Sequence, residues 1–251
     1  MKKIEAHLEC VRCHRQYDLT KVRYNCDCGG ILDLVRDLSQ LDGAELKMLW
    51  DSRWGEKRGA TSSGVWRYKE LIFDLPDDEI VTRQEGNTRL YNAGKAGEYA
   101  GLKHFLLKHE GENPTGSFKD RGMTCGTTAA KFYGAGTVAC ASTGNTSASM
   151  ASYAAVSGLR SVIFIPEGKI AYGKLAQALA FGGKTLQIKG NFDDAMALVQ
   201  EVCRELNIYL LNSINPFRIE GQKAIGFEVL QQLDWQVPDW FVIPKSEAKR
   251  S

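Results

Sequence analysis

One lysine stands where a long cationic side chain gains nothing from packing. Lys119 lies in the stretch GENPTGSFKDRGM (residues 111–123), just after a turn that contains proline and glycine. Ser117 and Asp120 have the S-x-x-D spacing of a capping-box variant, so we expect a helix to begin near Phe118. Lys119 would then project from the first helical turn.

The first turn of a helix is an unfavourable place for a cation, because the helix dipole is positive there. A lysine in that position is out of place unless its amine is neutral or covalently modified. An amine of lowered pKa is a nucleophile suited to forming a Schiff base. From the residues alone, a solvated surface lysine at position 119 is the alternative.

A second loop carries small polar side chains where another helix should begin. They are Ser142, Thr143, Asn145, Thr146 and Ser147, with Gly144 among them to permit a tight backbone. Hydroxyls and free N–H groups at a helix N-terminus make a site for a carboxylate or a phosphate. The alternative is an ordinary polar helix cap.

The elements that must position these two loops alternate in type. Short β-rich runs occur at 102–107, 137–141, 161–165, 184–188, 208–211 and 240–243. Helical periodicity lies between them, for example over 193–206, which predicts an α/β fold with an open, mostly parallel sheet and flanking helices. Upstream, we expect helix over 32–54 and a loop followed by a helix over 58–73. In such sheets ligands bind beyond the carboxyl ends of the strands, where both loops fall.

Four cysteines near the start have the spacing of a metal site. Cys10 and Cys13 are separated by twelve residues from Cys26 and Cys28. Two thiolate pairs on a short hairpin suit tetrahedral Zn²⁺, and four protein ligands make such a zinc structural. The sequence therefore predicts a small zinc ribbon, with unligated thiols as the alternative.

Composition excludes several classes of partner. Among 251 residues, 32 Lys and Arg face 30 Asp and Glu, a net charge of +2 that gives no reason to expect nucleic acid or an anionic membrane. No secretory signal and no apolar run long enough for a membrane span occur. An odd total of seven cysteines makes a poor disulfide framework, so we expect a reducing cytoplasm.

Five stretches together resemble the threonine synthase family, which uses pyridoxal phosphate on the tryptophan-synthase-β fold (fold type II). They are ENPTGSFKDR (112–121), STGNTSAS (142–149), EGNTRL (85–90), NSINPFRIEGQKAIGFEV (212–229) and the cysteine-rich start. EGNTRL departs from the family's pattern in having Arg89 in place of proline. The resemblance covers nearly the whole chain to about Pro244.

The resemblance implies a role for each matching residue. Lys119 is similar to the lysine that holds pyridoxal phosphate and later moves protons on Cα and Cβ, and Asn145 to the residue that bonds the pyridine 3′-oxygen. The substrate α-carboxylate would bind Ser142, Thr143, Asn145 and Thr146. The substrate phosphate would bind Asn212, Ser213 and Arg218 together with Thr146. Asn87 and Thr88 resemble residues of a lobe that closes on the substrate.

The reaction implied is the conversion of O-phospho-L-homoserine and water to L-threonine and phosphate. Phosphate leaves from Cγ and water adds at Cβ. A homodimer is one open alternative for the assembly. A threonine or serine dehydratase-like lyase is the competing enzyme, and the segment 212–229 argues against it because a dehydratase substrate carries no phosphate.

The family's pattern continues beyond residue 244, where this sequence ends in a short charged tail. We expect a zinc-ribbon-like segment (1–35), a catalytic α/β region that lacks its C-terminal part (36–244) and the tail (245–251). The Gly/Asn-rich loop that holds the cofactor phosphate would be absent, so activity of this form would be impaired, and strand 240–243 would form an exposed edge. A non-catalytic truncated remnant that acts as a binding module is the third alternative.

Overall fold

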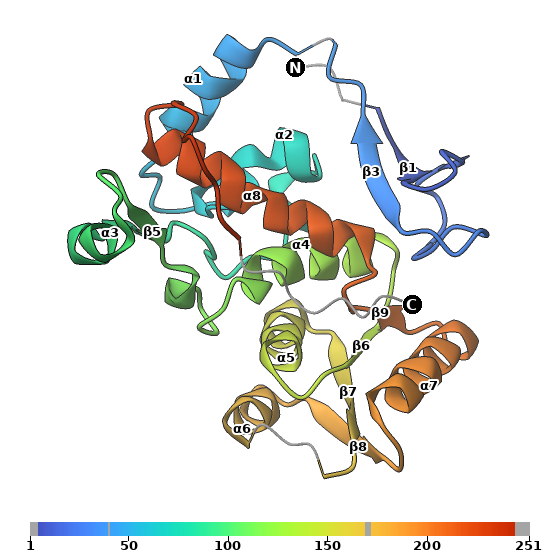
Figure 1. The fold of residues 1–251 in the computed structure, drawn as a ribbon. Helices are drawn as coiled ribbons and strands as arrows, with labels where there is room; N and C mark the ends of the chain where they lie inside the picture. Colours follow the sequence, from blue (N-terminus) through green and yellow to red (C-terminus); the bar gives the residue numbers. More distant parts are fainter. Residues whose placement is uncertain (1–4, 40, 169–171, 244–251) are drawn as a thin grey trace.

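A sheet of four parallel strands carries one half of the molecule (Figure 1). The computed structural model describes residues 5–39, 41–168 and 172–243. The strand order is β8-β7-β6-β9. Their bounds are Thr137–Ala141 for β6, Arg160–Pro166 for β7, Lys184–Ile188 for β8 and Tyr209–Leu210 for β9.

Both faces of this sheet are covered, as the apolar strand sequences require. Helices α5 (Asn145–Ser157) and α6 (Tyr172–Ala180) lie on one side and α7 (Phe192–Glu205) on the other (Figure 1). Alternate strand residues enter different clusters: Val138 packs with the cluster that includes α5, and Ala139 with the cluster that includes α7. The predicted strands 137–141 and 184–188 are confirmed, 161–165 is longer by one residue at each end, and 208–211 is shorter.

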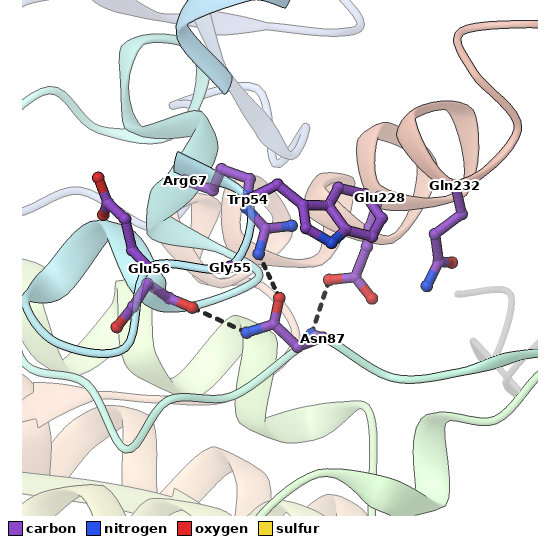
Figure 2. Close-up of a pocket in the computed structure, with 8 residues that line it drawn as sticks. Trp54, Gly55, Glu56, Arg67, Asn87, Glu228 and Gln232 are labelled. Carbon is purple, nitrogen blue, oxygen red and sulfur yellow. Dashed lines mark hydrogen bonds between the residues drawn. The ribbon is translucent and has the colours of Figure 1, made fainter. Parts of the chain in front are cut away.

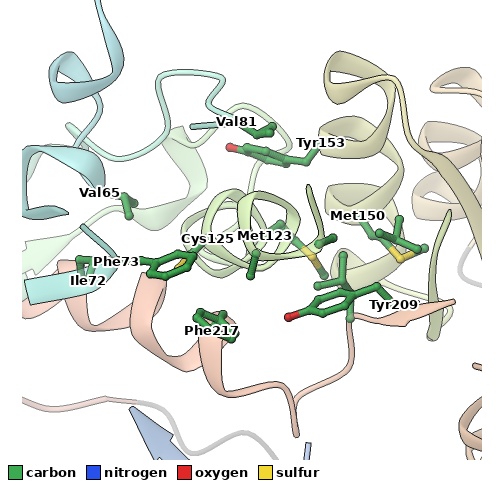
Figure 3. Close-up of a cluster of buried hydrophobic side chains, with 14 of the residues drawn as sticks. Val65, Ile72, Phe73, Val81, Met123, Cys125, Met150, Tyr153, Tyr209 and Phe217 are labelled. Atoms are coloured by element: carbon green, nitrogen blue, oxygen red, sulfur yellow. The ribbon is translucent and has the colours of Figure 1, made fainter. Parts of the chain in front are cut away.

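Two long helices pack directly against each other in the other half. They are α4 (Lys119–Phe132) and α8 (Pro216–Gln232). Gly221 permits the approach, because a Cβ there would lie 2.0 Å from the carbonyl oxygen of Arg121. Figure 3 shows the core beside them, where Met123 of α4, Met150 of α5 and Phe217 of α8 belong to one buried cluster.

The N-terminal ribbon is an antiparallel sheet of order β2-β1-β3. Strand β1 spans Ala6–Cys10, β2 spans Gln16–Tyr17 and β3 spans Leu32–Arg36. Arg36 Nη1 donates to Glu220 Oε2 of α8 at 2.7 Å, and both side chains are nearly or fully buried. The ribbon is thus fixed to the same helix that packs on α4.

Smaller elements connect the ribbon to α4. Helix α1 spans Gly43–Arg53 and α2 spans Lys69–Ile72, with short 3-10 segments nearby at 60–62, 66–68 and 77–79. Strands β4 (Leu90–Asn92) and β5 (Leu106–Lys108) pair antiparallel around α3 (Gly94–Ala100). A 3-10 turn at 110–112 leads into the lysine loop.

Three predictions about elements are wrong. Residues 32–36 form strand β3, because they pair with β1, so the helix expected over 32–54 is confined to α1. The run 102–107 is strand only from Leu106, since Leu102 N bonds Gly97 O to close α3. Residues 240–243 form no strand: Trp240 and Val242 are 86% and 87% exposed, and they pair with no strand among the described residues.

No helix in the described ranges has the length and apolar character needed to cross a membrane.

Candidate active site

The turn that carries the lysine is held at both ends. Asn113 O accepts a hydrogen bond from Gly116 N at 2.7 Å, and Gly116 has a φ of +75°, which favours glycine. The Asn113 side-chain oxygen accepts from Gly86 N at 2.9 Å, which joins this turn to the loop of residues 85–90. Lys119 therefore enters α4 from a backbone that is already fixed.

The capping box expected between Ser117 and Asp120 is wrong. Helix α4 has no side-chain cap, and Ser117 Oγ only accepts from Lys119 N at 3.2 Å. The buried Asp120 carboxylate turns back and accepts from Thr115 N at 2.7 Å and Thr115 Oγ1 at 2.6 Å. Ser149 Oγ of α5 donates to the same carboxylate. Spacing alone does not reveal whether an aspartate bonds its helix or the preceding turn.

The Lys119 amine is half-buried and has no carboxylate partner among the described residues. Burial, and after it the positive charge of Arg218, lower the pKa of this amine from 10.5 to about 8. Its Nζ lies 4.1 Å from the centroid of the Phe118 ring. The lowered pKa expected from the sequence is therefore present, and burial with a neighbouring guanidinium accounts for it.

The small polar residues after β6 form a tight turn into α5. Gly144 N donates to Ser142 Oγ at 3.2 Å, and Ser147 Oγ donates to Gly144 O at 2.8 Å. Helix α5 starts at Asn145 without a side-chain cap. Three further side chains of the turn make no hydrogen bond within the described chain: Thr143, Asn145 and Thr146. An uncapped helix start with free hydroxyls and an amide suits an anion.

The segment 212–218 leads from β9 to the start of α8. The Asn212 amide donates to Ala141 O at 3.1 Å and accepts from Ala141 N at 3.0 Å, so it fixes the end of β6 just before the turn. Ser213 is exposed. The Asn215 side chain caps α8, and Pro216 occupies the first helical turn.

Arg218 is a buried cation for which the described residues supply no counter-ion. Its side chain is 2% exposed, Nη1 donates to Leu211 O at 3.0 Å, and Nε has no partner. Burial lowers the pKa of this guanidinium from 12.5 to about 10. No carboxylate in the described ranges pairs with it. A buried guanidinium in this state favours an anionic ligand.

A buried charge cluster beneath the lysine turn was not anticipated from the sequence. Arg121 Nη2 lies 2.7 Å from Glu110 Oε1 and 3.0 Å from Glu228 Oε1, and Lys108 also pairs with Glu228. Burial alone raises the pKa of Glu228, but Arg121 and Lys108 outweigh it and hold the pKa well below its usual range. The available signal was a charged residue within the apolar run AIGFEVL (224–230) of α8.

Glu228 also holds the loop of residues 85–90. Its carboxylate accepts from Asn87 N at 2.8 Å and from Thr88 N at 3.0 Å. Figure 2 shows Asn87 between Glu228 and Arg67, beside a hollow of about 250 Å³. Both loop residues are thus bound to the framework here, and their role in closing on a substrate stays a prediction.

The four N-terminal cysteines converge as their spacing predicts. The sulfur atoms of Cys10, Cys13, Cys26 and Cys28 all lie within 4.8 Å of one another. Gly30 is required beside them, because a Cβ there would lie 2.6 Å from Cys10 Sγ. Sulfur atoms at tetrahedral Zn²⁺ stand roughly 3.8 Å apart, given Zn–S bonds of about 2.3 Å, so the donor set fits zinc.

A family model described as pyridoxal-phosphate dependent enzyme matches residues 81–248. The chain belongs to this family. Pyridoxal phosphate is the cofactor that membership implies, and the half-buried amine of lowered pKa fits a group held on a lysine.

The resemblance to threonine synthases is confirmed by curated relatives. The chain is 48% identical over 239 residues to threonine synthase of Methanocaldococcus jannaschii, covering 95% of this chain and 57% of the relative. It is 50% identical over 244 residues to threonine synthase of Methanosarcina acetivorans, covering 96% and 57%. The chain thus spans just over half the length of these relatives.

Solved structures confirm the fold class. The processed form of threonine deaminase isoform 2 from Solanum lycopersicum has a TM-score of 0.55 at 21% identity, covering 76% of this chain and 47% of that chain. Diaminopropionate ammonia lyase from Escherichia coli in complex with D-serine has a TM-score of 0.55 at 15% identity, covering 92% and 55%. At these identities the likeness shows the fold alone.

Proposed function

We propose that this chain carries the cofactor-binding lysine of a threonine synthase. The reaction is the conversion of O-phospho-L-homoserine and water to L-threonine and phosphate, with pyridoxal phosphate as cofactor. Relatives that are 48% and 50% identical and bear this name support the proposal. The geometry adds an independent reason.

The proposal rests mainly on two cationic side chains, Lys119 and Arg218, that have no carboxylate partner among the described residues. The charge of Arg218 lowers the pKa of Lys119, so the two groups act on each other electrostatically, and neither has a carboxylate partner in the described chain. A phosphate ester would supply the missing negative charge, and a guanidinium fork matches its oxygens. A dehydratase substrate would leave Arg218 unpaired.

Lys119 would hold pyridoxal phosphate and then move protons at Cα and Cβ of the substrate. The cofactor, when bound, delocalises the charge that these proton transfers create. Asn145 would bond its 3′-oxygen. Thr143 and Thr146, with Ser142, would bind the substrate carboxylate at the start of α5.

Arg218 would bind the substrate phosphate, assisted by Ser213 and Thr146. Asn212 holds the end of β6 through both of its amide bonds to Ala141. Its contribution to phosphate binding is therefore the position of the turn that starts at Ser142.

We further propose that Cys10, Cys13, Cys26 and Cys28 bind a structural zinc ion. Four sulfur ligands leave no open position for a substrate or water, so the metal would stabilise the ribbon rather than take part in the reaction.

Cofactor attachment tests the first proposal directly. Pyridoxal phosphate mixed with the chain should give a visible absorbance band, and borohydride reduction should fix the label on Lys119 in a peptide map. Lys119→Ala should lose the band, while Lys131→Ala, which removes an exposed lysine of the same helix, should keep it. Equal labelling in all three proteins would refute a cofactor role for Lys119.

The substrate is tested separately. Release of inorganic phosphate from O-phospho-L-homoserine, together with formation of L-threonine, is the expected reaction. Formation of a 2-oxo acid from L-threonine, without turnover of O-phospho-L-homoserine, would favour the dehydratase instead.

A further inference from the structure

Asp120 directly follows the candidate catalytic lysine in the sequence, but its carboxylate forms no ion pair with Lys119 among the described residues. The side chain is fully buried and pairs with no cation in the described chain. Its three hydrogen bonds come from Thr115 N, Thr115 Oγ1 and Ser149 Oγ. A buried carboxylate that is satisfied only by neutral donors requires a structural explanation.

We propose that Asp120 and Ser149 are positioning residues whose hydrogen bond fixes α4 against α5. In this way the bond sets the place of Lys119 relative to the turn at 142–147. The inference rests on the proposed function, since it assigns these two residues to the same site.

The placement of the two partners supports this role. Asp120 directly follows Lys119, and Ser149 stands four residues, about one helical turn, beyond Asn145. One bond therefore joins the residue that follows Lys119 to α5, about one helical turn from Asn145. Within the described residues it is the only hydrogen bond between α4 and α5.

The composition of the two helices gives such a bond a larger share in fixing their relative position. The buried positions of α4 and α5 are mostly glycine, alanine, serine and threonine. Small side chains interdigitate little across the interface. Their packing alone therefore fixes the position of one helix along the other only weakly. A directional, charge-assisted hydrogen bond supplies what the packing does not.

A third helix extends the same chain of bonds. Lys174 of α6 donates from Nζ to Thr115 O at 3.0 Å, and Thr115 donates twice to Asp120. The turn before the lysine is thereby held from α4 and α6 together, while Ser149 joins α5 to them. Among the described residues, Arg218 of α8 is the charged group that acts on the amine. Lys174 of α6 bonds the turn before it, and Asp120 follows it on α4.

Loss of the Ser149 hydroxyl has a predictable effect on Lys119. Water gains access to the amine when α5 loosens, and the Asp120 carboxylate is freed to turn toward it. Both changes favour the charged ammonium. Ser149→Ala should therefore raise the pH at which Lys119 becomes nucleophilic.

The experiment measures the amine without cofactor. Trace acetic anhydride labels lysines in proportion to their neutral fraction, and mass spectrometry reads the label at Lys119 from pH 6 to pH 11. The wild-type midpoint is expected near pH 8. In Ser149→Ala it should rise by about one pH unit, which lowers the rate at pH 8 about fivefold.

Two variants control the comparison. Ser149→Thr retains the hydroxyl and should restore the wild-type midpoint. Ser157→Ala removes a serine of the same helix that bonds only Tyr153 O and Ala154 O, and should leave the midpoint unchanged. An unchanged midpoint in a folded Ser149→Ala would overturn the proposal.

A variant that unfolds does not end the test. If Ser149→Ala loses its cooperative melting transition, Thr115→Val removes another hydroxyl bond to Asp120 without changing any charge, and a smaller upward shift of the Lys119 midpoint is expected. No shift there would overturn the proposal. Because no cofactor is used, failure of pyridoxal phosphate to bind would count against the proposed function alone.

Discussion

Arg218 offers the sharpest test of the phosphate assignment, because a binding role and a structural role predict opposite changes in stability. Arg218→Met keeps an apolar stem where the arginine Cγ and Cδ lie beside Gly126, and removes the guanidinium with its charge. Without ligand, this variant should be more stable than the wild type. With phosphate present, the wild type should gain stability and the variant should not.

The size of the effect follows from the pKa. Burial lowers the pKa of the Arg218 guanidinium from 12.5 to about 10, which at about 1.4 kcal/mol per tenfold change corresponds to a cost of roughly 3 kcal/mol for the charged form. The lost bond to Leu211 O offsets about 1 kcal/mol of this. A net gain of about 2 kcal/mol is expected. Because the folded pKa is the lower one, the cost is present in full below pH 10 and is relieved only as the pH rises through that value.

Urea unfolding at pH 7.5, with phosphate or chloride at equal ionic strength, measures both effects. Phosphate at a hundredfold excess over its Kd should stabilise the wild type by about 2.7 kcal/mol. Arg204→Met, which removes an exposed arginine of α7, should change neither quantity. Two results together would show that the arginine only supports the fold. They are a lower stability of Arg218→Met than of the wild type without ligand, and no effect of phosphate on the stability of the wild type.

Three further outcomes are expected. Glu228→Gln should lower the free energy of unfolding by about 3–5 kcal/mol, because it leaves Arg121 and Lys108 without their shared buried acid. The control Glu98→Gln, at an exposed position, should change this free energy little, and equal urea midpoints for the two variants would contradict the prediction. Gly221→Ala should cost at least about 1–3 kcal/mol by overpacking α4 on α8, while Gly226→Ala, which meets nothing within 4 Å, should be neutral or slightly stabilising in the same urea assay. Elemental analysis should find about one zinc per chain, and a chelator should lower the melting temperature; a metal-free ribbon with an unchanged melting temperature would refute the zinc site.

Local patterns were sufficient for the central sheet but not at its margins. The runs TVACA and KTLQI are short, contain β-branched and apolar residues and directly follow a glycine, and they form β6 and β8 over the predicted residues. The run WFVI at 240–243 has the same character, yet it forms no strand. Strand formation depends on a neighbour that supplies hydrogen bonds, and a local pattern carries no information about whether one exists.

The residues of the candidate site also differ in how far a local sequence pattern predicts them. Lys119 was recognisable because its position in a helix start is unfavourable unless its chemistry is unusual. The capping box that predicts a helix cap at Asp120 is a local pattern, whereas the partner Ser149 is 29 residues away. Glu228 and Arg121 are separated by 107 residues and could be paired only from the structure. Polar contacts between residues far apart in the sequence could not be predicted from local patterns.

The ribbon and the candidate phosphate site depend on one helix, so the ribbon is not an independent appendage. Arg36 of β3 is the buried partner of Glu220, which lies two residues after Arg218 in α8. Removing the ribbon would leave the Glu220 carboxylate with only Lys223, whose side chain is 37% exposed, as its counter-ion. A buried carboxylate deprived of its main partner destabilises the helix that bears it. The first turn of α8 would loosen, and Arg218 with it. The ribbon would therefore act on the proposed reaction only through the position of this helix.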